Sequence, residues 1–266
     1  MNWIYYFTGT GNTLFAAKKF AEALGENTKL ISIASLDRAQ TIEIPENVKT
    51  VGIFFPVYCF GLPQVVRRFV SRITVSDRKV YFYSCCTSGG VKGYASQVLQ
   101  EALKRRKIAL DAAFHLKMPS NYIAFTAPPK KSRCEKLYRD AVEKIQRYAA
   151  IVKARRKHHP LRVFPFDLWG ELVAKNAVSY LSDYDKYFWL NENCDGCETC
   201  EKVCPAANII IRNHMPTWRN HCEQCMACLQ WCPKQAIQFR QTSVKRARYH
   251  HPEITVEEVI NRRKDN

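Results

Sequence analysis

Eight of the twelve cysteines lie in one short stretch of the chain, in two runs with the same spacing. The runs are Cys194, Cys197, Cys200 and Cys204, then Cys222, Cys225, Cys228 and Cys232, and they are followed by Pro205 and Pro233. A C-x2-C-x2-C run lets three thiolates bind one 4Fe-4S cluster, while the fourth cysteine reaches a second cluster. The spacing therefore predicts two clusters with crossed ligand sets. One set is Cys194, Cys197, Cys200 and Cys232, and the other is Cys222, Cys225, Cys228 and Cys204.

Two other uses of clustered cysteines fit this spacing less well. Zinc also binds C-x-x-C units, but it needs two pairs for each metal and gains nothing from a third cysteine in step or from a following proline. Disulfides form in oxidising compartments, and nothing in the sequence suggests export. Iron-sulfur clusters are therefore the favoured interpretation.

The two cysteine runs also indicate an internal duplication. The segment CDGCETCEKVCPAANI at 194 to 209 is matched by CEQCMACLQWCPKQAI at 222 to 237. We predict two hairpin-and-turn units, residues 188 to 211 and 216 to 239, which are related by a pseudo-twofold axis and each close with a short strand. In every motif position this region resembles the bacterial two-cluster ferredoxins. The resemblance implies a small α+β ferredoxin domain.

The length of the chain leaves room for a second, larger domain. With 266 residues and 47% hydrophobic residues, the chain suits two globular domains. Its first residues, MNWIYYFTGTGN, contain no basic region and no small-residue cleavage site, and prolines interrupt the longest apolar stretch, Val51 to Val66. We therefore expect a cytoplasmic protein without a membrane span. Oxygen-labile clusters fit a reducing, anaerobic interior.

The N-terminal segment predicts a phosphate-binding loop between a strand, Trp3 to Phe7, and a helix, Leu14 to Leu24. The loop consists of Thr8, Gly9, Thr10, Gly11, Asn12 and Thr13. Backbone N–H groups at a helix N-terminus and threonine hydroxyls can hold an anion without a lysine. The loop lacks the G-K-[ST] of a Walker A and the third glycine of a dinucleotide fingerprint. TGTGNT resembles the phosphate loop of flavodoxins, and a plain connector is the alternative.

Strands and helices alternate along the first half of the chain, which predicts an α/β fold with a doubly wound parallel sheet. After the first strand, the predicted strands are Lys29 to Ile33, Val48 to Phe55, Lys79 to Cys85 and Ala113 to Met118, with helices near 63 to 73 and 94 to 107. The expected flavodoxin-like sheet has five strands in the order 2-1-3-4-5. Ligands bind such a sheet beyond the carboxyl ends of its strands, at the switch point between the first and third strands.

Two loops at those carboxyl ends are predicted to hold an isoalloxazine ring. The candidate residues are Pro56, Val57, Tyr58, Cys59, Phe60 and Gly61 in the first loop and Thr87, Ser88, Gly89, Gly90 and Gly93 in the second. Tyr58 and Phe60 offer flat faces for stacking, although packing at a strand end is the alternative. The glycines can turn backbone N–H groups toward the polar edge of the ring. Asn121 and Tyr122, after the fifth strand, are further candidates.

The second loop departs from many flavodoxins, because it has no aromatic residue within Thr87 to Gly93. The ring would then be more open to a substrate or to the ferredoxin domain. Together, the phosphate loop, the P-V-Y-x-x-G-x-P loop, the Asn121–Tyr122 rim and the cysteine runs resemble a family of fused flavodoxin-ferredoxin proteins from anaerobes. This resemblance implies FMN and two 4Fe-4S clusters on one polypeptide, used for electron transfer.

The chain is predicted to divide into four parts. These are a flavodoxin-like domain at 1–158, a connector at 159–184, a ferredoxin domain at 185–242 and a C-terminal tail at 243–266. An amphipathic pattern from Ser132 to Lys157 predicts the last helix of the first domain. Six aromatic residues between 160 and 187 favour a short helical connector that packs the domains together. The tail is basic and mildly helical from Ile254 to Arg263.

The chain has a formal net charge of +17, which falls to about +11 once two clusters and a flavin phosphate are included. Residues 128 to 162 contain twelve Lys or Arg and three acidic residues. Such a run is usually a solvated face, and no nucleic-acid-binding motif accompanies it. Docking of an acidic redox protein, guided by charge, is the functional alternative.

The leading hypothesis is an electron-transfer protein of the oxidoreductase class that links one-electron clusters to a two-electron flavin. The first alternative is an enzyme that reduces a small organic acceptor at the flavin, and the second is a regulatory or nucleic-acid-binding iron-sulfur protein. The remaining cysteines, Cys59, Cys85, Cys86 and Cys134, are expected to be buried small hydrophobes. A reactive thiol is the alternative for Cys59.

Overall fold

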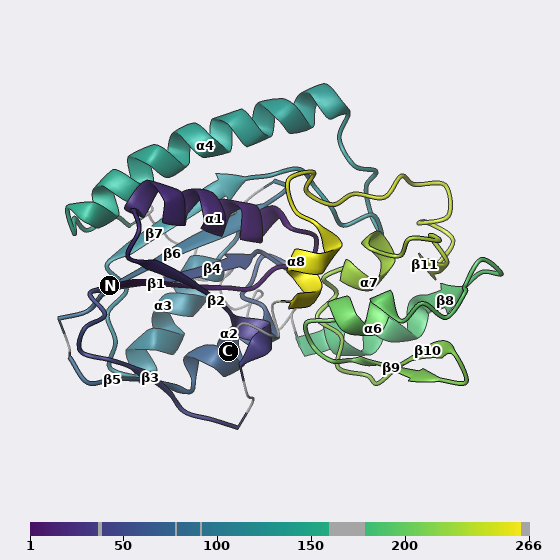
Figure 1. Ribbon diagram of the computed structural model, residues 1–266, viewed down its shortest axis with the longest axis horizontal. Coiled ribbons are helices and arrows are strands. Elements are labelled where there is room, and N and C mark those ends of the chain that lie inside the picture. The colour runs from purple at the N-terminus through teal and green to yellow at the C-terminus, as the bar shows by residue number, and fades with distance from the viewer. Residues whose placement is uncertain (37–38, 78, 91, 160–178, 262–266) are drawn as a thin grey trace.

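The computed structural model describes residues 1–36, 39–77, 79–90, 92–159 and 179–261. The first half of the chain is built on a five-stranded sheet with the order β2-β1-β4-β6-β7 (Figure 1). The strands are β1 (Asn2–Tyr6), β2 (Thr28–Ser32), β4 (Thr50–Pro56), β6 (Tyr81–Ser88) and β7 (Ala112–Lys117). All neighbouring strands run parallel. The predicted flavodoxin-like sheet of order 2-1-3-4-5 is confirmed.

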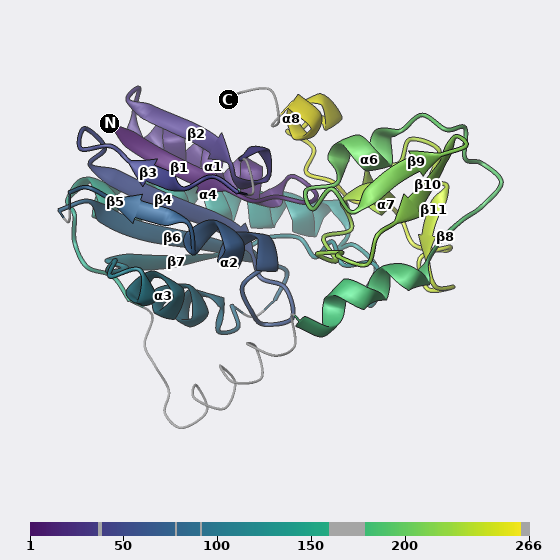
Figure 2. The ribbon, with the colours of Figure 1, turned by 90° about the horizontal axis from the view of Figure 1, so that it is seen from below.

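Helices cover both faces of this sheet (Figures 1 and 2). They are α1 (Asn12–Leu24) and α4 (Lys131–Lys153) on one face, and α2 (Gln64–Val70) and α3 (Ala95–Arg105) on the other. The helix expected near 63 to 73 ends earlier, because Ile73 belongs to β5 (Ile73–Val75), which pairs in parallel with β3 (Ile42–Ile44). Runs of three residues are too short to show a period in the sequence. A single 3-10 turn, η1 (Ile33–Ser35), follows β2.

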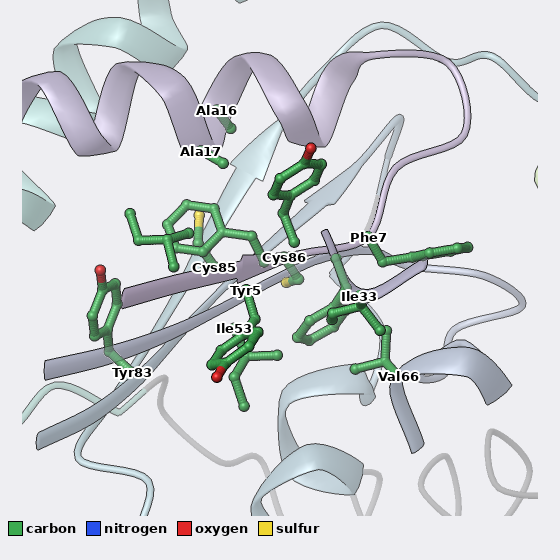
Figure 3. Close-up of a cluster of buried hydrophobic side chains, with 14 of the residues drawn as sticks. Tyr5, Phe7, Ala16, Ala17, Ile33, Ile53, Val66, Tyr83, Cys85 and Cys86 are labelled. Carbon is green, nitrogen blue, oxygen red and sulfur yellow. The ribbon is translucent and has the colours of Figure 1, made fainter. Parts of the chain in front are cut away.

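The core lies between the sheet and its helices (Figure 3). A parallel sheet covered on both faces needs strands that are apolar throughout, and Phe54, Phe82 and Cys85 are almost fully buried. The Tyr83 ring stacks on Phe20 at 5.5 Å and occupies the space above Gly52, where a Cβ atom would lie 2.6 Å from the ring. Cys85, Cys86 and Cys134 are buried as predicted, whereas Cys59 is exposed.

Four short strands form the second half of the described chain. They are β8 (Phe188–Leu190), β9 (Ile209–Arg212), β10 (Met215–Trp218) and β11 (Ile237–Phe239), and the short helices are η2 (Ser179–Tyr187), α6 (Thr199–Val203) and α7 (Ala227–Gln230). The antiparallel pairs are β9 with β10 and β8 with β11. Each pair therefore takes one strand from each predicted unit. Each half closes with a short strand, as expected, but the two units are not separate hairpins. Pairing across the two halves lets the short strands bury their apolar side chains in one common core, which contains Ile209 and Phe239.

The duplication itself is visible in the backbone. Left-handed φ angles recur 28 positions apart: 72° at Gly196 and 54° at Gln224, 61° at Glu198 and 60° at Met226, and 50° at Ala207 and 49° at Gln235. The cysteines of the two runs have the same offset. The two halves therefore repeat the same turns, including turns that force non-glycine residues into a conformation they rarely adopt.

The end of the chain does not remain a separate tail. Helix α8 (Val256–Asn261) lies against α6 and is tied to α1 by an ion pair of 2.6 Å between Lys18 and Glu258 (Figure 1). Most of the predicted connector, 160–178, lies outside the described residues, so the domain boundaries stay predictions. Within the described ranges, no helix combines the length and the apolar character that crossing a bilayer requires.

Candidate functional site

The phosphate loop joins the end of β1 to the start of α1. Gly11 adopts a φ of 94°, which a glycine reaches without strain, and its N–H donates to the Thr8 hydroxyl at 3.2 Å. The Thr13 hydroxyl lies 2.8 Å from that of Thr87 on β6. Thr8, Thr10 and Thr13 are all buried. The loop therefore offers hydroxyls and N–H groups at a helix N-terminus, which is a neutral donor set that suits a phosphate group.

This loop forms the floor of a hollow at the carboxyl ends of the strands. The hollow contains about 800 Å³ of empty space, its open mouth included, which is within the usual range for small-molecule sites. Of the predicted candidates, it is lined by Thr8, Gly9, Thr10, Asn12, Thr13, Pro56, Val57, Tyr58, Cys59, Thr87, Ser88 and Gly89. Residues 118 to 122, which include Asn121 and Tyr122, and Gln224 complete the lining.

Five predicted residues do not line the hollow: Gly11, Phe60, Gly61, Gly90 and Gly93. The open side of Gly11 faces the C-terminal tail, where a Cβ atom would lie 3.0 Å from His251. Phe60 sits in a tight turn closed by hydrogen bonds between Tyr58 and Gly61, with a φ of 61° and 55% of its surface exposed. The turn directs Phe60 to solvent, and Gly93 packs behind its backbone. Tyr58 is thus the aromatic residue of this loop that borders the hollow, and its ring meets Phe7 edge to face at 6.1 Å.

One wall of the hollow comes from the cysteine-rich half of the chain, which agrees with the expectation that the ring is open to the ferredoxin domain, although no single residue of this wall was predicted. Gln224, between two cysteines of the second run, lines the hollow and accepts a hydrogen bond of 3.2 Å from the Tyr122 hydroxyl. The carbonyl of Cys225 lies 2.6 Å from where a Cβ atom on Gly9 would be. Only a glycine lets the phosphate loop and the cysteine loop approach this closely.

Further polar contacts hold this wall in place. The Trp231 indole N–H donates to the Gly9 carbonyl at 3.0 Å, and Gln230 donates to the Asn121 carbonyl at 2.7 Å. The buried Glu223 carboxylate accepts from the N–H of Gln64 at the start of α2 and forms a 2.9 Å ion pair with Arg68. The two halves are therefore joined by bonds on several sides of the hollow.

The structure brings the cysteines together in two groups, which we call the outer set and the inner set. The outer set, Cys194, Cys197, Cys200 and Cys232, lines one small cavity. Burial raises the pKa of the Cys200 thiol to about 12, and the neighbouring Cys232 and Cys197 add to this rise. Cys197 is exposed and Cys194 is partly exposed, so this set lies near the surface.

The inner set consists of Cys204, Cys222, Cys225 and Cys228. Burial raises the pKa of the Cys222 and Cys228 thiols, and in both cases Cys225 and Cys204 are close enough to raise it further. The two groups have the composition predicted from the spacing, and their roles as ligand sets stay a prediction. The inner set lies beside the hollow, because Gln224, which lines the hollow, lies between Cys222 and Cys225 in the chain, and the Cys225 carbonyl packs against Gly9 of the lining.

Backbone N–H groups point at sulfur atoms at equivalent places in the two halves. Asn208 donates to the Cys204 sulfur at 3.2 Å, and Ala236 donates to the Cys232 sulfur at 3.3 Å. Gln224 donates to the Cys222 sulfur at 3.3 Å. Hydrogen bonds of this kind stabilise thiolates and tune cluster potentials. Four sulfur donors in each group, with N–H groups aimed at them, fit a 4Fe-4S cluster, whose positive iron would offset the raised thiol pKa values.

A buried carboxylate organises the loop that precedes the inner set. Asp185 Oδ2 accepts hydrogen bonds from Asn208 Nδ2 at 2.9 Å and from the N–H of Asn220 at 2.8 Å. Asn208 Oδ1 accepts in turn from the N–H of His221 at 2.8 Å. The approach to Cys222 is therefore fixed by side chains that are themselves buried.

The back of the phosphate loop is covered by the C-terminal tail. The N–H of His251 donates to the Thr10 carbonyl at 2.9 Å, and the Tyr249 hydroxyl donates to Asn12 at 2.6 Å. The fully buried His251 ring stacks on Phe15 at 4.0 Å. The sequence predicted neither contact, since His250 and His251 sit in a polar run far from residues 8 to 13.

The buried His251 predicts that the packing of the tail against the phosphate loop is less stable at low pH. Burial, aided by His250 and Lys19, lowers the pKa of His251 from 6.5 to about 3. The neutral form is favoured in the folded protein, so the stabilisation is present above about pH 6.5 and is lost as pH falls toward 3, by about 1.4 kcal/mol per pH unit. We expect proteolysis of the tail to accelerate between pH 7 and 5 and to be nearly independent of pH in His251→Phe. Equal acceleration in both proteins would contradict this assignment.

Comparison with known proteins adds to this picture. Residues 193–237 match the family model of the 4Fe-4S dicluster domain. Similar solved structures include a flavodoxin from Megasphaera elsdenii, with 15% identity over 54% of this chain and 99% of that chain and a TM-score of 0.34. They also include a flavodoxin from Streptococcus pneumoniae, with 11% identity over 58% and 98% and a TM-score of 0.39. No curated protein matches significantly.

These structural scores are low, so the assignment of the first domain rests on the order and direction of its strands. A flavodoxin-like sheet is joined to a 4Fe-4S dicluster domain, and the predicted fused flavodoxin-ferredoxin architecture is confirmed. This combination supports a role in electron transfer.

Proposed function

We propose that the protein passes electrons between two 4Fe-4S clusters and an FMN bound in the hollow. The observation that carries this proposal is the shared wall, because the segment from Cys222 to Cys225 contributes both to the inner cysteine set and to the lining of the hollow. Electron tunnelling falls steeply with distance. A wall shared by the two proposed sites would keep the distance for electron transfer short.

The chemistry comes from the cofactors, since a cluster carries one electron at a time and a flavin carries two. The chain positions them. The loop of residues 8 to 13 would hold the FMN phosphate, and Tyr58 and Tyr122 would border the ring. The outer and inner cysteine sets would each bind one cluster. The outer set is nearer the surface and would exchange electrons with a partner, while the inner set would face the flavin.

Anaerobic purification with iron, sulfide and flavin analysis, followed by rapid mixing with a limiting amount of reductant, tests this proposal. Absorbance changes of the clusters should appear first, and bleaching of the flavin should follow at a rate independent of protein concentration. A flavin that stays oxidised while the clusters are reduced would contradict it. Steady turnover of a small organic acceptor, without any protein acceptor, would instead favour the reductase alternative.

The partner that fits best is an acidic redox protein. The basic helix α4 and the net charge of +17 support electrostatic guidance of such a partner. None of the twelve cysteines, all within the described residues, forms a disulfide, and this supports the cytoplasm as the working compartment. Electron transfer to an acidic acceptor should slow markedly as salt rises. Rates that do not respond to ionic strength would remove the docking proposal and leave the internal transfer intact.

A further inference from the structure

A half-buried arginine lies beside the outer cysteine set. Arg248, on the segment that leads to the tail, donates through Nη2 to the carbonyl of Ile237 at 2.9 Å and to that of Gln235 at 3.4 Å. Both carbonyls belong to the stretch that follows Cys232, the last member of the outer set. Arg248 and Cys232 also line a second surface cavity, which is separate from the flavin hollow. The guanidinium is therefore fixed next to this cysteine.

Two donors of this guanidinium lack an acceptor in the described part of the chain. Nε and Nη1 of Arg248 are buried, and neither has a hydrogen-bond partner among the described residues. No carboxylate in the described ranges forms an ion pair with Arg248 either. Leaving charged donors buried and unpaired is costly, and native proteins rarely do so without a reason.

The negative groups near Arg248 are cysteine sulfurs. Burial lowers the pKa of Arg248, while Cys232 and, to a smaller extent, Cys228 counteract this shift by favouring the charged guanidinium. Cluster sulfurs accept hydrogen bonds, and the reduction potential of a cluster depends on these bonds and on nearby charge. One-electron reduction adds one negative charge to the cluster. A fixed, half-buried cation therefore stabilises the reduced form.

We propose that Arg248 raises the reduction potential of the cluster held by the outer set. It thereby helps to determine which of the cofactors is reduced first. The hydrogen bonds of Arg248 run to the carbonyls of Gln235 and Ile237, which do not line the proposed flavin site, and Arg248 acts as a positioning residue through its charge. This inference rests on the proposed ligand sets of the clusters. It does not depend on whether electrons continue to the flavin.

The test is a redox titration of both clusters in the full-length holoprotein, followed by electron paramagnetic resonance. In Arg248→Gln, the ratio of reduced to oxidised outer cluster at the wild-type midpoint should fall about tenfold, which corresponds to about 59 mV for one electron. The inner cluster should shift less. Arg246→Gln is the matched control, because it removes the same charge and also breaks a hydrogen bond to a backbone carbonyl, that of Ile123. Its outer cluster should titrate like that of the wild type.

Arg248→Gln also removes the hydrogen bonds to the carbonyls of Gln235 and Ile237, which stabilise the local fold. Arg248→Lys therefore supplies a second measurement. Lysine keeps the charge and loses the fork of donors, and its outer midpoint should lie closer to the wild type than to Arg248→Gln. Iron content of all variants is measured alongside. An unchanged midpoint in iron-replete Arg248→Gln would overturn the proposal. A shift in Arg248→Lys as large as that in Arg248→Gln would also overturn it. Failure of flavin reduction in the wild type would contradict the proposed function without affecting these midpoints.

Discussion

Replacing Gly9 with alanine should weaken FMN binding and slow electron transfer from the inner cluster to the flavin. A Cβ atom at this position would lie 2.6 Å from the Cys225 carbonyl, 3.0 Å from Cys225 Cβ and 3.2 Å from the Tyr58 hydroxyl. The nearest neighbour is backbone and cannot swing away, so one of the two loops has to move. Overpacking of this kind costs about 1–3 kcal/mol. If the cost falls on the flavin-bound state, FMN affinity drops by about fivefold to 150-fold.

The measurement is FMN titration of the reconstituted protein by quenching of flavin fluorescence, with iron content as a check on folding. Gly90→Ala is the matched control. It makes the same change in a nearby loop where nothing lies within 4 Å of the added atom. Equal FMN affinity and equal transfer rates in Gly9→Ala and the wild type would show that the two loops do not meet as described.

Removing one cysteine from each set should separate the roles of the two clusters. Cys200 and Cys228 occupy equivalent positions in the duplicated halves, one in the outer set and one in the inner set. Because each 4Fe-4S cluster needs four ligands, Cys200→Ala and Cys228→Ala should each retain about half the iron. Cys228→Ala should abolish cluster-dependent flavin reduction, since the inner set is the one beside the hollow. Cys200→Ala should still reduce the flavin when a small chemical donor supplies the electrons.

The comparison is made by iron and sulfide analysis together with rapid-mixing absorbance of the flavin. Cys134→Ala is the control for loss of a buried cysteine, because Cys134 belongs to neither set. Flavin reduction at the wild-type rate in Cys228→Ala, or its loss in Cys200→Ala, would contradict the assignment of the inner set as the link to the flavin.

Local features of this chain could be predicted from the sequence, and contacts between distant segments could not. The cysteine spacing and the alternation of strands and helices are short-range patterns with a direct structural meaning, and the sheet follows from them. Gln224, Trp231 and His251 reach the flavin hollow or its loop across more than a hundred residues. No spacing rule connects a glutamine between two cysteines to Tyr122, or a histidine in a polar tail to Thr10.

Two differences between the expected and the observed arrangement have a common physical origin. Phe60 was expected to stack on the flavin because it is aromatic, yet a tight turn directs it to solvent. The strands of the ferredoxin domain were expected to pair within each half, yet each short strand pairs with one from the other half. In both cases the local character of the segment could be read from the sequence. Tertiary structure determines in which direction the Phe60 side chain points and with which strand each short strand pairs. Such choices depend on packing that a single sequence does not display.

The C-terminal tail, which covers the back of the phosphate loop, has a consequence for the order in which the protein is assembled. Tyr249 and Glu258 close around residues that leave the ribosome some 237 to 240 positions earlier. The sheet can assemble as soon as β7 has emerged, since domains tend to fold in order during synthesis. Both cysteine runs, at 194–204 and 222–232, follow later but still precede Tyr249 and Glu258, so they are made before the nucleotide pocket has its rear support. We therefore expect the iron-sulfur clusters to be inserted first and FMN to be bound stably last.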